Sequence, residues 1–353
     1  MANIKDSLDM IASTLDAWKA EAPNAIIENN GLLYFFKKFG KMGLKGQNSE
    51  PMGSIETLDG GKRISVDVLI TDNPNVGFVA YDETVPIVEQ DSMATAYYDW
   101  KFCYGNAPIA NAKIDLNSGS KFEKRRLVTS VKEVAESSMI NAVGLGLWNT
   151  TDGDGLLGIP SIITDDGTST GGSAVGGLST DTYPNWKNQY VELAESHTSA
   201  ELRVAMGQLW RKTKIGAESP DLIVCGDALY SEYEQTLVAN ERYARSEKAQ
   251  KVADSGFECL TYKGAVVIFD EHCPDNRMYF INTKALAFYF HSQDIFSIGE
   301  MEKKYGGMQF NFPLSTTCAL VCKNRKMHGV LVVASSTTTT TSTSTSTTST
   351  TSA

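Results

Sequence analysis

Residues 120–149 read SKFEKRRLVTSVKEVAESSMINAVGLGLWN, the longest stretch of helical character in the chain. Leu127, Val131, Val134, Ala135, Ala142 and Leu145 recur at helical spacing, with Lys, Arg and Glu opposite them near the start. We therefore expect Val131 and Val134 to face a sheet. Thirty residues would span about 45 Å, too long for an ordinary helix of a small domain. The stretch predicts a spine helix that ends at the Gly- and Asp-rich turn 150–155.

Upstream of this helix, the sequence predicts a projecting hairpin. Ile64, Val66 and Val68 alternate with polar residues, which indicates a half-buried strand, and a second strand is expected over 93–104. The stretch between them, 72–91, holds two prolines and five acidic residues. We interpret it as carrying few large apolar side chains, too few for a core of its own.

The N-terminal segment predicts an amphipathic helix, since Ile4, Leu8, Ile11, Leu15 and Trp18 form one apolar stripe before Pro23. This helix either packs on its own domain or docks, as an arm, on a neighbouring subunit or a scaffold.

Downstream of the spine, helix and strand signals alternate from about residue 150 to 275, and strand character returns after Arg277. The order of these elements indicates an α+β or α/β layer. Residues 335–352 are all Ser or Thr, which predicts disorder in solution, with a strand on a partner as the alternative. The tail is expected to be dispensable for assembly.

Composition and charge narrow the function classes. The 353 residues are 42% hydrophobic and carry a net charge of −10, which disfavours direct nucleic-acid binding but is compatible with lining a container of nucleic acid. The N-terminus lacks the apolar core of a signal peptide, and no stretch is long and apolar enough for a membrane span. The six cysteines form no CxxC pair and are interpreted as reduced core residues.

No catalytic, cofactor-binding or metal site is predicted. Asp152-Gly153-Asp154-Gly155 opens like a calcium loop, but Ile163 stands where the bidentate Glu belongs. The four histidines, His197, His272, His291 and His328, lack metal-ligand spacing, and the neighbouring Cys273 does not supply a second ligand pair. The Gly-rich stretch 167–177 lacks the phosphate-cradle pattern and its Lys. The chain is therefore expected not to be an enzyme.

Short motifs in a fixed order, over most of residues 54–333, resemble the major capsid proteins of tailed bacteriophages. They are Trp100-Lys101, Asn117-Ser118-Gly119, Gly155-Leu156-Leu157-Gly158-Ile159-Pro160, Gly176-Gly177, Tyr183 to Gln189, Pro220 to Val224, Arg242-Tyr243, Gly256-Phe257, Asp270, Tyr279 to Asn282, and Lys323 to Leu331.

The resemblance implies the α+β Hong Kong 97 capsid fold. The expected parts are an N-terminal arm (1–53), an extended β-hairpin loop (54–104), the first part of a peripheral domain with the spine helix (105–149), an axial domain (150–285), the return strands of the peripheral domain (286–334) and the Ser/Thr-rich tail (335–353).

By the same resemblance, the chain would self-assemble as pentamers and hexamers into an icosahedral shell, formed in the host cytoplasm, around the DNA of a tailed phage. DNA would be enclosed without sequence-specific binding and without a membrane. A portal protein and a separate scaffold or decoration protein are the expected partners. Some relatives cross-link a loop Lys to a neighbour's Asn; Lys62 lies in a plausible region, but no motif assigns its partner.

Three alternatives stay open at this point. An encapsulin-type nanocompartment shell would share the fold and would be distinguished by cargo genes beside it. An α/β enzyme is favoured only by the Gly-rich loops and the Asp152 turn. A surface adhesin is suggested by the Ser/Thr tail and opposed by the absent signal peptide.

Overall fold

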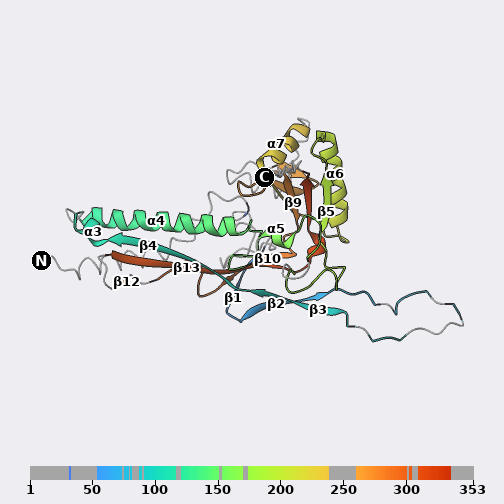
Figure 1. The fold of residues 1–353 in the computed structure, drawn as a ribbon, viewed down its shortest axis with the longest axis horizontal. Helices are drawn as coiled ribbons and strands as arrows, with labels where there is room; N and C mark the ends of the chain where they lie inside the picture. The colour runs from blue at the N-terminus through green and yellow to red at the C-terminus, as the bar shows by residue number, and fades with distance from the viewer. Residues whose placement is uncertain are drawn as a thin grey trace, which may run out of the picture.

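The computed structural model shows an elongated molecule built on two six-stranded sheets and a projecting two-stranded hairpin (Figure 1). It describes residues 32, 54–73, 75–78, 80–81, 87–89, 91–116, 121–150, 153–169, 174–237, 260–299, 302–303 and 309–334. The expectations for the N-terminal amphipathic helix and for the Ser/Thr tail lie outside these residues, as do Asp152 and Cys259.

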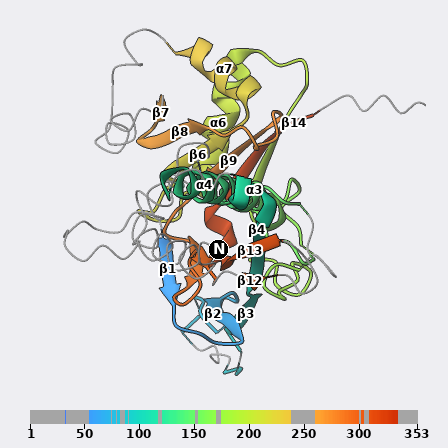
Figure 2. The same cartoon turned by 90° about the vertical axis from the view of Figure 1, so that its left-hand side faces the viewer.

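The spine helix is confirmed as α4, which spans Lys121–Gly146. It lies along β4 (Lys101–Ala110) and β13 (Gln309–Cys322), the two long strands of the first sheet (Figure 1). Figure 2 shows α4 almost end-on above these strands, with the short helix α3 (Asn111–Leu116) beside it. A sheet face covered by one long helix needs an apolar helix face, and α4 provides it in its C-terminal half.

The buried face of α4 agrees only in part with the face that the sequence indicates: Val131 and Ala135 are partly buried against an apolar cluster, as expected. Val134 is 64% exposed, and Ala142 and Leu145 also face solvent. The buried positions follow the same helical spacing on a neighbouring stripe: Lys132, Glu136, Met139, Ile140, Val143 and Leu147. The prediction was wrong for Val134, Ala142 and Leu145, because it treated Lys132 and Glu136 as solvated.

Lys132 and Glu136 lie one helical turn apart, so their opposite charges stabilise each other beneath the helix. The ammonium of Lys132 lies 5.5 Å from the centre of the Phe312 ring. Burial lowers the pKa of Lys132 to about 8, and the neighbouring Glu136 charge opposes this shift. Such a charged pair in a core position is uncommon, which is why apolar periodicity alone misplaced the helix face.

Two valines three residues apart, Val131 and Val134, test which face of α4 is buried. Val131→Asp should destabilise the subunit by about 1–3 kcal/mol, because Val131 is partly buried against the Ile109 and Phe312 cluster. Val134→Asp should change stability by less than about 0.5 kcal/mol, as surface substitutions do. Chemical denaturation of both variants measures the difference, and equal destabilisation by the two would contradict the observed helix face.

The first sheet has the order β1-β10-β13-β11, with β12 and β4 also paired to β13. Its shorter strands are β1 (Ser54–Leu58), β10 (Leu286–His291), β11 (Ser297–Ile298) and β12 (Glu302–Lys303). β13 is long enough to pair antiparallel with β10 at one end and with β4 along most of its length. The strand LAFYFH of β10 is buried at five of its six residues, as expected for the central part of a core.

The second sheet has the order β5-β14-β9-β6-β8-β7. Its strands are β5 (Gln189–Leu193), β6 (Leu222–Cys225), β7 (Leu260–Tyr262), β8 (Ala265–Phe269), β9 (Arg277–Ile281) and β14 (Gly329–Val333). The helices α6 (Ser199–Thr213) and α7 (Asp227–Thr236) cover one face of it (Figures 1 and 2). The other face joins the main core, which also holds the short helix α5 (Ile159–Ile162).

One strand lies in a different sheet from the one that its sequence position suggests. The sequence groups 329–333 with the return strands 286–334, but β14 pairs with β5 and β9 in the second sheet. The chain reaches it from β13 through the 3₁₀ turn Arg325–Met327. A buried run such as GVLVV fits either sheet, so only the tertiary structure assigns it.

Candidate assembly surfaces

The projecting hairpin consists of β2 (Arg63–Leu69) and β3 (Met93–Asp99), paired antiparallel from Arg63 opposite Asp99 to Leu69 opposite Met93. One face of this ribbon is buried against the main core. Its side chains are Ile64, Val68, Ala96 and Tyr98. The alternation that the sequence shows in 64–68 therefore marks the side of the hairpin that is attached to its own subunit.

Hydrogen bonds fix the base of the hairpin to the body of the subunit. The Tyr98 hydroxyl donates to the Cys322 carbonyl at 2.9 Å, and the Asn185 amide donates to the Ile70 carbonyl at 2.8 Å. The Tyr97 N–H donates to the carbonyl of Gly176, at 2.9 Å. A side chain at position 176 would collide with Ala96, because an added Cβ would lie 2.7 Å from the Ala96 Cβ, so this approach requires glycine.

The hairpin also exposes large apolar side chains, most of them beyond this base. They are Leu69, Val76, Phe78, Tyr81, Ile87, Val88, Met93 and Tyr97. The expectation of few large apolar residues in 72–91 was wrong: five of these eight lie in that stretch. None of the eight belongs to the subunit's cores. A concentration of exposed apolar surface on one projecting element is typical of a surface that binds another protein.

Asn75 joins the two arms of this loop. Its side-chain amide donates to the Val88 carbonyl at 2.7 Å, and its side-chain oxygen accepts from the Val88 N–H at 3.1 Å. The Asn75 backbone N–H in turn donates to the side chain of Asn73, at 2.9 Å. The amide thus reproduces the pair of hydrogen bonds of a β-ladder beyond the end of β2 and β3, a role that the sequence analysis missed.

The body that carries the hairpin is held together by a buried arginine. Arg325 is fully buried, and its guanidinium donates five hydrogen bonds at 2.7–3.4 Å. The acceptors are the carbonyls of Ile162 and Trp186 and the side chains of Ser169, Thr164 and Asn188. Since all five N–H groups of the guanidinium have acceptors, its charge is tolerated within the core.

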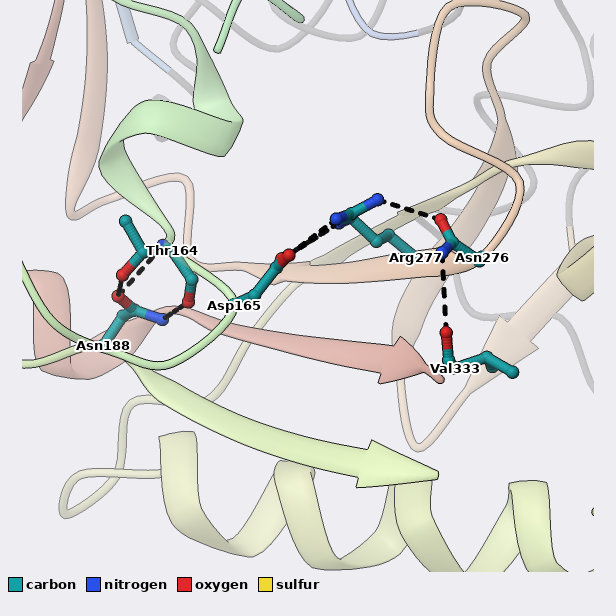
Figure 3. Close-up of polar contacts among 6 residues, drawn as sticks. All are labelled: Thr164, Asp165, Asn188, Asn276, Arg277 and Val333. Atoms are coloured by element: carbon teal, nitrogen blue, oxygen red, sulfur yellow. Dashed lines mark hydrogen bonds and ion pairs between the residues drawn. The ribbon is translucent and has the colours of Figure 1, made fainter. Parts of the chain in front are cut away.

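A second set of polar contacts joins the same loop to the second sheet (Figure 3). The Asp165 carboxylate accepts from Arg277 Nε and Nη2, with the shortest contact at 2.6 Å, and this pairing raises the pKa of Arg277. Next to it, Thr164 and Asn188 exchange hydrogen bonds between the Thr164 backbone and the Asn188 amide. Residues 162–169 and 186–188 are therefore joined to β9 and to the turn after β13.

The comparison with known families assigns this architecture. The model of the SU10 major capsid protein family matches residues 121–335, more than half of the chain and including α4, the second sheet and β13. The chain belongs to the SU10 major capsid protein family. It is thus a major capsid protein of the tailed-phage type, and the family match favours a phage shell over the nanocompartment alternative.

Solved capsid structures share the fold of this capsid protein at low sequence identity. The capsid of cyanophage A-1(L) aligns with a TM-score of 0.58 and 15% identity over 79% of this chain and 89% of that chain. The capsid of a native GTA particle gives a TM-score of 0.52 and 15% identity, over 84% and 94% of the chains. The Mycobacterium phage Adephagia gives 0.50 and 13%, over 80% and 88%. No curated protein matches.

Among the described residues of the capsid protein, those singled out for chemistry form no common site. His197 pairs with Glu232 at 3.0 Å beside α6, and the His291 ring contacts Trp100 edge-on. Within the described part of the chain, Cys103, Cys225, Cys273, Cys318 and Cys322 are free thiols, and no group of three metal-type ligands is present. The described helices also include none that could cross a membrane. Lys62 borders a cavity with Trp100 and Asp294.

His328 is a buried titratable group whose pKa the fold lowers strongly. It lies fully buried three residues after Arg325, and its Nδ1 accepts from the Asn282 N–H at 3.2 Å. Burial lowers the pKa of His328 to about 4; the Arg325 charge reinforces this shift, and hydrogen bonding to the Ala285 backbone opposes it. His328 is therefore neutral at physiological pH.

This burial predicts acid sensitivity of the subunit. Between pH 6.5 and about 4 the unfolded chain binds a proton at His328 and the folded chain does not, so stability falls as the pH is lowered through this window. The loss should be on the order of 3 kcal/mol. His328→Asn, which keeps an acceptor for Asn282, should lose less stability between pH 7 and 4.5 in denaturation curves. An equal loss of stability in the parent and in His328→Asn over this pH range would show that His328 is not the group responsible.

Proposed function

We propose that this capsid protein closes into an icosahedral shell of pentamers and hexamers by laying the hairpin β2–β3 across a neighbouring copy. The observation that supports this most strongly is the pairing of a fixed base with exposed apolar side chains beyond it. A hairpin that was merely a surface loop would have polar side chains where Phe78 and Tyr81 stand. Burying them on another copy removes apolar area from water, at about 25 cal/mol per Å².

The parts of the subunit take roles that follow from this arrangement. We assign residues 1–53 as an arm, 54–104 as the extended loop, 105–149 with 286–334 as the peripheral domain and 150–285 as the axial domain, with β14 contributing to the axial sheet. Rigid bodies and extended reaching elements are what a closed surface of many copies requires, because each copy gains several weak contacts at once.

The charge and the family of the chain support a proposal for the content and surroundings of the shell. With a net charge of −10, the wall would enclose phage DNA without binding it sequence-specifically. We propose a structural, non-enzymatic role in the virion, with assembly in the host cytoplasm beside a portal protein and a separate scaffold or decoration protein.

Phe78→Asp tests the role of the hairpin in assembly with a single side chain. Phe78 is fully exposed in the subunit, so the variant should fold with an unchanged melting temperature. Its shells should be lost, or should need at least about tenfold more protein to form, because a charge would be buried at the contact. Sedimentation measures this, and Phe78→Leu is the matched control that should still assemble. Normal shells from Phe78→Asp would exclude Phe78 from the interface.

A further inference from the structure

Leu32 packs beside the second sheet, and the residues that it contacts there are far from it in the sequence. Its side chain is 1% exposed and belongs to the main apolar core, together with Ile268 and Cys273 on either side of Asp270. Its backbone N–H donates to the Asp270 carboxylate at 3.1 Å, across 238 positions of sequence. Leu32 is thus attached to the body in two ways: its side chain packs in the core, and its backbone N–H donates a hydrogen bond.

Asp270 is held in place to receive this donor. It follows β8 directly, its N–H donates to the Cys225 carbonyl at 3.2 Å, and its own carbonyl accepts from Cys273 at 3.1 Å. One carboxylate oxygen accepts from the His272 N–H at 3.0 Å, which leaves the other oxygen directed at Leu32. Because Asp270 is only 2% exposed, a carboxylate oxygen without a hydrogen-bond donor would be costly at this position.

We propose that Leu32 and Asp270 form a latch that ties the N-terminal arm to its own subunit's second sheet. The latch would fix the arm at Leu32, so that the residues before it are the part proposed to reach another copy. Thirty-one residues reach at most about 110 Å when fully extended. This free part holds the apolar stripe Ile4, Leu8, Ile11, Leu15 and Trp18. Its use on a neighbour rests on the proposed assembly, whereas the latch itself does not.

The latch can be tested on the unassembled subunit by hydrogen exchange and limited trypsin digestion. Samples are diluted until sedimentation shows monomers only. In the parent, the Leu32 amide should exchange slowly. Asp270→Ala should speed its exchange by about tenfold or more, as expected for losing a hydrogen bond to a charged acceptor. It should also speed tryptic cleavage at Lys37, Lys38 and Lys41.

Matched variants separate the latch from general loosening. Asp221→Ala removes another carboxylate of the same sheet, one that accepts two hydrogen bonds from Thr283, and should leave Leu32 exchange unchanged. Leu32→Ala removes the other partner of the contact and should also release the arm. The double variant should exchange and be cleaved no faster than either single variant, because both substitutions act on one contact.

The same experiments can overturn the proposal. If Asp270→Ala proves poorly folded, Asp270→Asn and Leu32→Ala carry the test, since Asn keeps one acceptor and Leu32 lies outside the sheet. Slow exchange of Leu32 in Asp270→Ala, additive effects in the double variant, or protection of Leu32 in assembled shells but not in monomers would each show that no such intrachain latch exists. Normal shells from Phe78→Asp, in a subunit whose latch is intact, would instead contradict only the assembly proposal.

Discussion

Replacing Asn73–Gln90 with an Asn-Gly turn is expected to abolish closed shells and to leave the subunit folded. The described residues of this stretch contribute nothing to the three apolar cores, so the monomer loses no buried packing. The ladder from Arg63 to Leu69 remains, and Asn-Gly is suited to close two antiparallel strands. What disappears is the surface that carries Val76, Phe78, Tyr81, Ile87 and Val88.

Two measurements on this variant separate folding from assembly. Its circular dichroism melt should match that of the parent to within a few degrees, while sedimentation should show small species only. A milder variant, Asn75→Ala, keeps every apolar side chain and removes only the bridge to Val88, so it should assemble more weakly than the parent. Full-sized shells from the shortened hairpin would mean that it does not hold copies together.

Arg325→Leu is expected to be among the most damaging single substitutions in the chain. The buried carbonyls of Ile162 and Trp186 and the Asn188 side chain would each lose a donor. At about 1–3 kcal/mol for each buried group left unsatisfied, the subunit should lose roughly 3–5 kcal/mol. A chain of this size should then melt about 10 °C lower.

The matched control is an arginine on the surface. Arg211→Leu, on the exposed side of α6, should shift the melting temperature by only about a degree or two. Arg325→Lys should fall between the two, because an ammonium has three N–H donors against the five that Arg325 uses. A melting temperature for Arg325→Leu within two degrees of the parent would show that residues 162–169 and 186–188 do not depend on this side chain.

The sequence predicts which helices and strands form better than it predicts which faces they bury and which sheet they join. The helix expected over 120–149 forms as Lys121–Gly146, since its length and its Gly-rich end are local properties. Its buried face could not be read in the same way, because Lys132 and Glu136 occupy core positions as a pair. Likewise, nothing local shows that β14 joins the second sheet.

In the assembly surfaces, too, local features could be predicted and contacts between distant residues could not. Alternation in 64–68 indicates the hairpin, and the resemblance indicates its purpose. The bridging role of Asn75 and the central role of Arg325 depend on partners 13 and more than 130 positions away, which no single-sequence pattern reveals. Arg325 does stand beside the buried strands β13 and β14, and an arginine in such a setting is a signal worth testing.

The most direct test of the central claim is cross-linking within shells assembled from equal amounts of light and ¹⁵N-labelled subunits. Zero-length coupling of Glu89, which is exposed in the hairpin, to lysines is followed by mass spectrometry of the joined peptides. If the hairpin lies across a neighbour, Glu89 peptides should be joined in mixed light and heavy pairs as often as in uniform ones. Cross-links of Glu89 found only within a single isotope class would show that the hairpin contacts its own subunit, and would contradict the account.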